Sequence, residues 1–150
     1  MNECSVVTKI GNLRIRDNGR AVTGITFDGE GESGHMSDLA RLVVAEIEEY
    51  LAGRRRVFTV PYELPDTPVF WRAVWDALGK IKYGEVKTYG EIAREIGSPK
   101  GARAVGQGCH NNPISVIVPC HRVVGSDGSV TGYAGGVEVK KLLLRIEQNP

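Results

Sequence analysis

A cysteine and a histidine stand side by side at Cys120 and His121, directly after Pro119. A thiolate is a strong nucleophile, and an imidazole with a pKa near neutrality is a suitable base to generate it. An unperturbed cysteine has a pKa of about 8.5, so a neighbouring base or cation increases its reactivity at neutral pH. Arg122 adds a positive charge beside the pair. The pattern predicts a nucleophilic Cys120.

The dipeptide alone also fits a structural interpretation, in which Cys120 is a buried packing residue beside a surface histidine. For an arbitrary Cys-His pair this interpretation is the more frequent one. Adjacent side chains point to opposite faces of a regular strand, so direct contact between Cys120 and His121 would require a turn or a bridging water.

A second pair, Cys109-His110, raises the question of a zinc site shared with Cys120 and His121. Adjacent Cys and His side chains converge poorly on one tetrahedral ion, and neither usual ligand spacing is present. With Cys4, the chain has three cysteines and no Cys-x-x-Cys motif, so neither a disulfide framework nor a zinc ribbon is predicted. Cys109 is expected to be a small packing residue.

The composition is that of a globular protein: 150 residues, 41% hydrophobic and 25% charged, enough for one core or two small ones. No apolar run is long enough to span a bilayer and the N-terminus lacks signal-peptide features, so a cytosolic protein, or a nuclear one in a eukaryote, is expected. The net charge of +1 gives no global attraction to nucleic acid. However, residues 98–126 contain Lys100, Arg103 and Arg122 and no acid, a local positive surface suited to a phosphate backbone.

The first part of the chain predicts a small sheet and one helix. Strands at 5–10 and 13–16 flank Gly11-Asn12, and a third at 21–27 completes a meander before a glycine-rich loop at 29–34. A helix is predicted over 38–51, with Ser37 or Asp38 as N-cap and Gly53 as stop. Its expected apolar face consists of Leu39, Leu42, Val43, Ile47, Tyr50 and Leu51.

Two charged and apolar segments follow this helix. Residues 54–56 are three arginines, most simply a solvated run, with a phosphate contact as the alternative. A further strand is predicted at 57–60. Pro61, Pro65 and Pro68 then mark a linker.

Beyond the prolines the pattern becomes helical. A helix over 70–78 carries two tryptophans four residues apart, which favours core packing over base stacking. Thr88 to Glu91 form a capping box that opens a short helix to residue 96. A second helix begins at Ser98-Pro99 and runs to Cys109, which makes a helix-turn-helix candidate.

After Asn112-Pro113, a buried extended segment is predicted at 114–118, a glycine-rich loop at 125–136, and a closing helix at 137–146. The second helix of the candidate helix-turn-helix is rich in small residues, and each interior glycine costs about 1 kcal/mol of helix stability relative to alanine. Something must therefore approach it closely. A nucleic-acid groove and ordinary helix packing both remain open at this point.

Five spaced blocks of the sequence resemble the O6-alkylguanine-DNA alkyltransferases. Together they extend over most of residues 68–150, whereas residues 1–60 show only a compatible strand pattern. The blocks are Gly84-Glu85-Val86 with Thr88-Tyr89, Ala102-Arg103-Ala104-Val105-Gly106, Asn112-Pro113, Ile117-Val118-Pro119-Cys120-His121-Arg122-Val123, and Gly132-Tyr133-Ala134-Gly135-Gly136 with Lys140.

The resemblance implies an α+β fold with two domains. Residues 1–62 would form a small antiparallel sheet with a helix, of the RNase H-like type. Residues 63–150 would form a helical, winged helix-turn-helix-like domain that carries the active site. It implies no cofactor and no metal.

The resemblance also implies the chemistry: irreversible transfer of an alkyl group from O6 of a damaged guanine in double-stranded DNA to Cys120. His121, acting through a water and oriented by Glu147, would generate the thiolate. Tyr89 would protonate or stabilise the departing guanine, with assistance from Lys140, because negative charge moves from sulfur to the base.

A buried thiol can reach the base only if the base leaves the duplex. The resemblance implies that Arg103 fills the vacated stack and that Ala102 and Gly106 lie against the minor groove. It also implies that the protein binds DNA without sequence specificity and mainly as a monomer. Tyr89 and Arg122 complete the expected DNA-binding set, and Asn112 would be a hinge between the recognition helix and the active-site segment. The expected guanine pocket comprises Cys109, Pro119, Val123, Tyr133, Ala134, Gly135 and Lys140.

Three classes of function are compatible with a reactive Cys-His pair. A DNA alkyltransferase requires the thiol, the relay, the arginine and the groove helix, and the sequence has all of them. In the lesion-sensing alkyltransferase-like proteins the reactive cysteine is typically replaced, so Cys120 argues against that class. An unrelated Cys-His hydrolase would require repeated turnover and an oxyanion hole, for which the sequence offers no candidate.

Overall fold

The computed structural model describes residues 1–148, which divide into two compact units. The first comprises Met1–Pro65 together with Pro113–Ile117, and the second comprises Asp66–Asn112 and residues 118–148. The expectation of separate domains at 1–62 and 63–150 stays a prediction. The two units differ from it in two respects: the first unit extends to Pro65, and it includes Pro113–Ile117, the segment just before Cys120.

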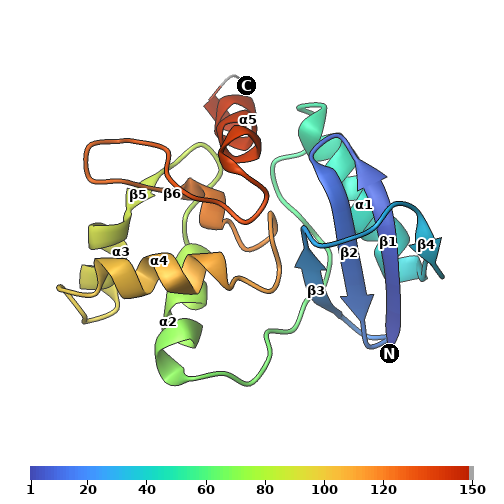
Figure 1. Cartoon of the computed structure of the whole chain (residues 1–150), viewed down its shortest axis with the longest axis horizontal. Helices are drawn as coiled ribbons and strands as arrows, with labels where there is room; N and C mark the ends of the chain where they lie inside the picture. Colours follow the sequence, from blue (N-terminus) through green and yellow to red (C-terminus); the bar gives the residue numbers. More distant parts are fainter. Residues whose placement is uncertain (149–150) are drawn as a thin grey trace. The chain divides into compact units, whose positions relative to one another are not determined.

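The first unit contains a four-stranded antiparallel sheet in the order β3-β2-β1-β4 (Figure 1). The strands are β1 (Asn2–Thr8), β2 (Gly11–Asp17), β3 (Val22–Thr26) and β4 (Ser33–Gly34). The predicted meander is confirmed, but its first turn lies at Lys9-Ile10, because Thr8 pairs with Gly11. The predicted loop at 29–34 contributes a fourth strand. At Gly34 a side chain would lie 2.6 Å from the carbonyl oxygen of Glu3, so only glycine permits this pairing.

The helix α1 (Asp38–Leu51) is confirmed, with Ser37 as its N-cap, but its buried face differs from the predicted one. Leu42 is exposed, whereas Glu46 is only 1% exposed. The Glu46 carboxylate accepts hydrogen bonds from the backbone N–H and the hydroxyl of Thr59 and lies 3.6 Å from Arg55. Because Thr59 is bound in this way, residues 57–60 form no strand, and that prediction is wrong.

Two segments outside the named strands pair with β3. The backbone of Val22 exchanges hydrogen bonds with Pro61 and Glu63, so the start of the predicted linker is an extension of the sheet. Ile25 bonds in the same way to Pro113 and Ser115. The predicted extended segment at 114–118 is therefore reduced to a bridge at Ile114.

The turn that follows Ile114 contains a backbone strain. Val116 has φ 72°, a conformation that a β-branched residue rarely adopts. Its side chain is nevertheless buried. Residues 115–117 are thus a turn, and Cys120 does not follow a regular strand.

The second unit is helical. Its elements are α2 (Val69–Leu78), β5 (Lys87–Thr88), α3 (Tyr89–Glu95), α4 (Ala102–His110), the 3₁₀ turn η1 (Cys120–Arg122), β6 (Val123–Val124) and α5 (Val137–Gln148). The strands β5 and β6 pair in parallel and join the start of α3 to the end of the cysteine-bearing turn (Figure 1).

The core of this unit forms where α2 packs on α4. Trp75 is 2% exposed and its indole N–H donates to the carbonyl of Gly108, which confirms its predicted core role. A side chain at Gly108 would lie 3.2 Å from Val74, so glycine permits the close approach of the two helices. This contact explains one of the small residues of α4.

The ends of the helices test the predicted signals. The capping box at Thr88 and Glu91 is confirmed. The predicted start of the next helix is wrong, because Ser98 to Gly101 form a turn closed by a 2.8 Å backbone hydrogen bond and α4 begins at Ala102. The closing helix is longer than predicted and ends at Gln148.

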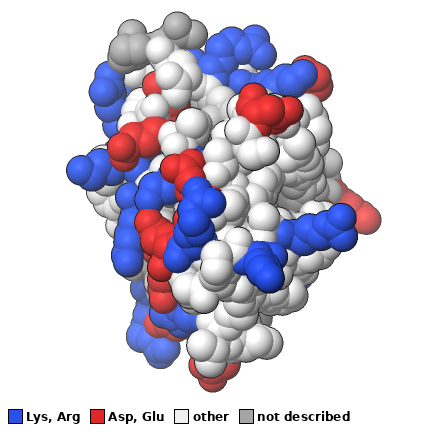
Figure 2. Space-filling model, turned by 90° about the vertical axis from the view of Figure 1, so that its left-hand side faces the viewer, with Lys and Arg blue, Asp and Glu red and all other residues white. Residues whose placement is uncertain are grey.

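Charged side chains of the second unit are unevenly distributed on the side where α3 and α4 lie (Figure 2). Figure 2 views the side on which α3 and α4 lie, and shows Lys and Arg side chains, with some acids among them, next to a broad uncharged area. Arg94, Lys100 and Arg103 are exposed residues of these helices and their connecting turn. Among residues 1–148, no helix is long and apolar enough to cross a membrane.

Candidate active site

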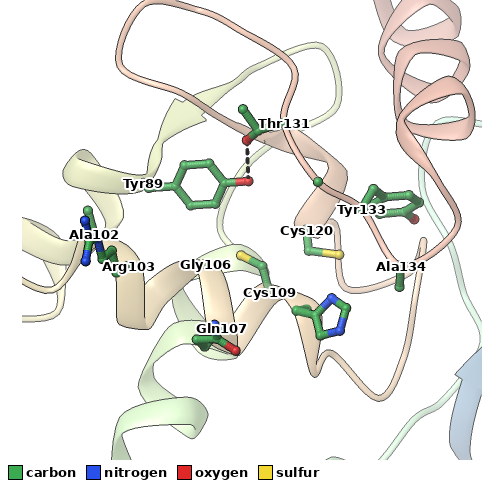
Figure 3. A pocket seen from close by; sticks show the side chains of 12 residues that line it. Tyr89, Ala102, Arg103, Gly106, Gln107, Cys109, Cys120, Thr131, Tyr133 and Ala134 are labelled. Carbon is green, nitrogen blue, oxygen red and sulfur yellow. Dashed lines mark hydrogen bonds between the residues drawn. The ribbon is translucent and has the colours of Figure 1, made fainter.

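A cavity of about 570 Å³ opens in the second unit between α3, α4, η1 and the loop before α5 (Figure 3). Predicted site residues that line it are Tyr89, Ala102, Arg103, Gly106, Cys109, Cys120, Tyr133 and Ala134. Four further lining residues, Gln107, His110, Thr131 and Gly132, were not predicted as part of the site. The structure therefore brings the thiol and four of the five residues expected to contact DNA, all except Arg122, to one cavity.

Cys120 lies at this cavity and is only 4% exposed. Burial raises the pKa of its thiol, while a hydrogen bond from the Asn112 side chain and the positive charge of Lys140 act in the opposite direction. Burial dominates, so the group is a neutral thiol near pH 7. A base is therefore needed to generate the thiolate, which the Asn112 amide and the Lys140 ammonium stabilise.

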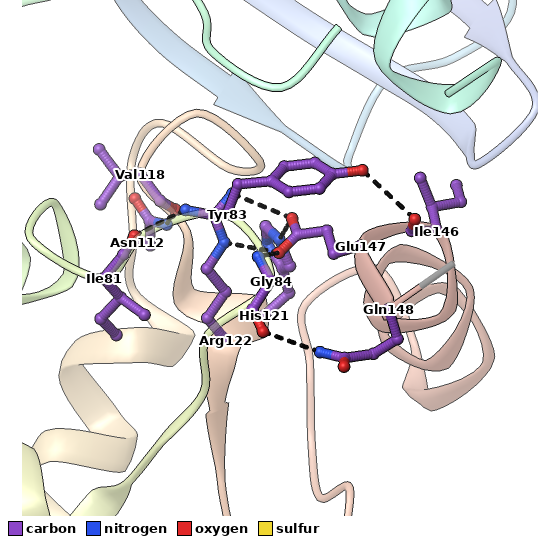
Figure 4. A network of polar contacts seen from close by, with 10 residues as sticks. All are labelled: Ile81, Tyr83, Gly84, Asn112, Val118, His121, Arg122, Ile146, Glu147 and Gln148. Carbon is purple, nitrogen blue, oxygen red and sulfur yellow. Dashed lines mark hydrogen bonds and ion pairs between the residues drawn. The ribbon is translucent and has the colours of Figure 1, made fainter. Parts of the chain in front are cut away.

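His121 is fully buried next to the thiol in sequence, and its Nε2 lies 2.8 Å from Oε2 of Glu147 (Figure 4). An ionised carboxylate only accepts hydrogen bonds, so Nε2 carries the proton and Nδ1 has the lone pair. Burial lowers the pKa of His121, and the charges of Arg122 and Lys140 lower it further, against the effect of Glu147. The imidazole is thus neutral and able to accept a proton near pH 7.

The Glu147 carboxylate makes four hydrogen bonds, with groups of three residues. Its Oε1 accepts from Arg122 Nε at 2.8 Å and from the N–H of Gly84 at 3.2 Å, and its Oε2 accepts from His121 and from Arg122 at 3.0 Å. A third guanidinium nitrogen of Arg122 donates to the carbonyl of Ile81 at 2.7 Å. Arg122 and Gly84 therefore fix the position of the carboxylate that contacts the imidazole, and Arg122 neutralises its charge.

This geometry corrects the prediction for Arg122. The sequence suggested that it belongs to a positive surface for DNA, but the residue is only 7% exposed and all three guanidinium nitrogens bond within the second unit. Its charge is neutralised by Glu147, 25 residues later in the chain. The count of charges over residues 98–126 does not include this acid. Arg122 supports the Glu147–His121 pair instead.

Asn112 ties the end of α4 to the segment that carries the thiol. Its side-chain amide donates to the carbonyl of Val118 at 2.7 Å and forms the hydrogen bond to Cys120 already described, and its backbone N–H donates to Cys109. The residue is 6% exposed. A single amide thus connects the helix to both sides of Pro119, and the expected role of Asn112 as a hinge stays a prediction.

Lys140 contacts Tyr89, one of the residues that line the cavity. Lys140 is fully buried, and its Nζ donates to the Tyr89 hydroxyl at 3.3 Å and to the Thr131 carbonyl at 2.9 Å. The Tyr89 hydroxyl also lies 3.2 Å from the Thr131 hydroxyl (Figure 3). The phenol oxygen of Tyr89 therefore accepts a hydrogen bond from an ammonium group and lies next to a hydroxyl group.

One face of α4 forms the floor of the site. Arg103, Gly106, Gln107 and His110 are three or four residues apart, so they share this face. A side chain at Gly106 would meet only the Tyr89 ring, at 3.9 Å, so packing inside the protein does not require this glycine. The helical spacing from Arg103 could have predicted Gln107 and His110.

Some expected pocket residues do not line the cavity. Pro119 caps η1, and Val123 is fully buried and pairs with Lys87. Gly135 and Lys140 are not among the lining residues. No group of three or more His, Cys, Asp or Glu able to hold a metal occurs within residues 1–148.

Comparison with known proteins gives matches to one family. Residues 69–149 match the family model described as 6-O-methylguanine DNA methyltransferase, DNA binding domain. A curated protein of Haemophilus influenzae, named methylated-DNA–protein-cysteine methyltransferase, is 40% identical over 149 residues, which cover 94% of this chain and 83% of that protein.

A methylated-DNA–protein-cysteine methyltransferase of Methanosarcina acetivorans is 50% identical over 102 residues, 68% of this chain. The match spans slightly less than two thirds of that relative, 65% of its length. The crystal structure of Mycobacterium tuberculosis OGT in complex with DNA superposes with a TM-score of 0.84 and 38% identity, covering 96% of this chain and 91% of that one. The agreement extends through the first unit and confirms the mixed α+β fold.

Proposed function

The chain belongs to the family of the 6-O-methylguanine DNA methyltransferases, and on this premise we propose that it repairs DNA by transferring a methyl group from O6 of guanine to Cys120. Curated relatives carry the name methylated-DNA–protein-cysteine methyltransferase, and a structural neighbour is bound to DNA. The observation that carries the proposal is the buried Cys120 thiol at a cavity large enough for a base, next to a neutral histidine fixed by Glu147.

The first step is formation of the thiolate. Nδ1 of His121 accepts the Cys120 proton through a water, and the Glu147 carboxylate stabilises the imidazolium that results. The Asn112 amide and the Lys140 charge stabilise the thiolate, because both favour the ionised form of Cys120. These groups compensate in part for the cost of a charge in a buried site.

The second step is displacement at the methyl carbon. The sulfur–carbon bond forms as the carbon–O6 bond breaks, and the electron pair stays on guanine. Tyr89 donates its proton to the departing base, and Lys140 stabilises the charge that develops on the phenol oxygen, since its ammonium already contacts that atom. The imidazolium and the phenolate return to neutrality by proton transfer through water.

The product is a thioether, which has no leaving group activated for transfer back. We therefore propose that each chain acts once, in a stoichiometric and irreversible reaction. The proposal requires no cofactor, because both proton transfers use side chains of the second unit.

The base must leave the duplex to reach Cys120. We propose that α3 and α4 act as a helix-turn-helix that binds the minor groove without sequence specificity. Arg103 is exposed at the edge of the cavity and fills the space vacated by the base, and Ala102 and Gly106 permit close approach of the groove. The winged and RNase H-like descriptions of the two domains, and action as a monomer, belong to the same proposal.

The experiment uses duplex DNA with one radiolabelled O6-methyl group. The wild-type chain should acquire the label and release unmodified guanine in the duplex, while Cys120→Ser should bind the duplex and acquire none. Cys109→Ala is the matched control, because it removes the other thiol at the cavity. Label on Cys120→Ser equal to the wild type would disprove the assignment.

A further inference from the structure

Thr131 is a residue of the cavity to which the proposed mechanism gives no role. It lies in the loop between β6 and α5, and its hydroxyl is 3.2 Å from the hydroxyl of Tyr89. Its backbone carbonyl accepts from Lys140 Nζ at 2.9 Å, and the same ammonium donates to the Tyr89 hydroxyl at 3.3 Å. Three residues from three separate segments therefore close a ring of hydrogen bonds, of which Figure 3 shows the contact between Tyr89 and Thr131.

The donors and acceptors in this ring can be counted. An ammonium group only donates, so the Tyr89 oxygen is the acceptor towards Lys140, and the single phenol proton points elsewhere. A threonine hydroxyl has one proton and two lone pairs, so it can accept the phenol proton or rotate and donate to the phenol oxygen. Thr131 can thus interact with either protonation state of Tyr89.

We propose that Thr131 is a positioning residue for proton delivery by Tyr89. In the empty cavity its hydroxyl accepts the phenol proton and holds the ring in place. When a base occupies the cavity, the threonine hydroxyl rotates and donates to the phenol oxygen, so that the phenol proton points to the base. This inference rests on the proposed function, because it needs a departing base that accepts a proton.

The proton balance of this step is complete. The phenol O–H bond breaks, the proton goes to the guanine that leaves with the electron pair of the carbon–O6 bond, and the phenolate remains. Hydrogen bonds from Lys140 and Thr131 then stabilise the phenolate, as donors around an oxyanion do. Without the threonine hydroxyl the phenolate keeps one of its two donors.

The surroundings of Thr131 separate this role from a structural one. The residue is exposed, so its side chain contributes little to a core, and a substitution at such a surface position usually changes stability little. Thr131→Val should therefore fold like the wild type. Ser126→Ala, an exposed change in the same loop, is the matched control.

The test measures the single-turnover rate of methyl transfer from a duplex with O6-methylguanine for Thr131→Val, Thr131→Ser and Ser126→Ala. Loss of one hydrogen bond to the developing charge should slow Thr131→Val by about three- to tenfold. Serine should restore the rate, and the control should match the wild type. A Thr131→Val variant as fast as the wild type would overturn the proposal.

A double-mutant comparison identifies the route of the effect. In a Tyr89→Phe background, Thr131→Val should have no further effect on the rate, because the threonine hydroxyl then has no phenol oxygen to act on. Rate losses that multiply would refute positioning through Tyr89. Failure of the wild type to transfer methyl would instead refute the proposed function.

Discussion

His121 and Glu147 form a hydrogen bond of 2.8 Å between two buried side chains, 26 residues apart in the chain. The same carboxylate is bound by Arg122, so a negative charge, a positive charge and a neutral base share one buried site. The arrangement fixes which imidazole nitrogen can accept a proton. It also makes the base part of the structural core of the second unit, so changes here affect stability as well as chemistry.

Glu147→Gln should therefore be costly in two ways. The substitution removes the negative charge and leaves the Arg122 guanidinium buried without its counter-ion, so the free energy of unfolding should fall by about 3 kcal/mol. Methyl transfer should slow, because glutamine does not stabilise an imidazolium. Urea unfolding and single-turnover rates measure the two effects. Glu138→Gln is the matched control on the same helix, since that side chain is 87% exposed, and an equal loss in both variants would contradict the account.

The rate of methyl transfer should depend on the protonation of His121. Burial lowers the pKa of this residue below its ordinary value of 6.5, and only the neutral form accepts a proton. The rate should stay level from neutral pH down to about 6.5 and fall at lower pH. A rate profile between pH 5 and 8, with substrate binding saturated, provides the measurement. A loss of rate centred above pH 6.5 would show that another group controls the reaction.

The same pKa shift has a consequence for stability. Below pH 6.5 the unfolded chain binds a proton on His121 that the folded chain does not, so the free energy of unfolding should decrease as pH falls towards the lowered folded value. The contribution is fully present above the ordinary pKa. Urea unfolding at several pH values between 5 and 7.5 should show this slope, and His121→Asn should show a smaller one. An identical slope in the variant would assign it to other groups.

The two glycines Gly106 and Gly108 should respond oppositely to alanine. At Gly108 the new methyl would lie 3.2 Å from Val74, which is fully buried, so Gly108→Ala should destabilise the fold despite its better helix propensity. At Gly106 the methyl meets only the Tyr89 ring at an ordinary distance, so Gly106→Ala should stabilise the fold by up to about 1 kcal/mol. It should nevertheless weaken DNA binding, because that face of α4 is proposed to approach the groove. Thermal unfolding and DNA titration separate the two effects, and unchanged DNA affinity in Gly106→Ala would argue against groove contact.

Arg103→Ala should affect duplex substrates only. If Arg103 occupies the place of the extruded base, its loss should slow transfer from duplex DNA by at least about tenfold, because unstacking costs a few kcal/mol. The reaction of Cys120 with free O6-benzylguanine should keep most of its rate, since no base has to leave a duplex. Lys100→Ala, another exposed basic residue, controls for the loss of one charge. Equal losses with both substrates would contradict the role of Arg103.

Local signals in the sequence predicted local structure well. The capping box at Thr88, the N-cap at Ser37 and the strand alternation around Gly11 depend on residues close in the chain, and the structure has each of them near its predicted position. The cysteine and the cavity around it were indicated by spaced motifs together, and not by the Cys-His pair alone.

Interactions between distant residues could not be predicted in this way. Nothing near Arg122 in sequence indicates that Glu147 neutralises it, and nothing near Thr59 indicates that Glu46 takes its backbone N–H and prevents a strand. The turn at Val116 adopts a conformation that its residue type disfavours, so propensity predicted the opposite.

The central claim is that Cys120 is the acceptor of one methyl group. The most direct test is the intact mass of the protein after incubation with an excess of duplex DNA that carries O6-methylguanine, followed by peptide mapping. The account predicts a mass increase of one CH₂ group, located on Cys120 and saturating at one per chain. An unmodified protein that still binds the lesion, or repair of many lesions per chain, would contradict it.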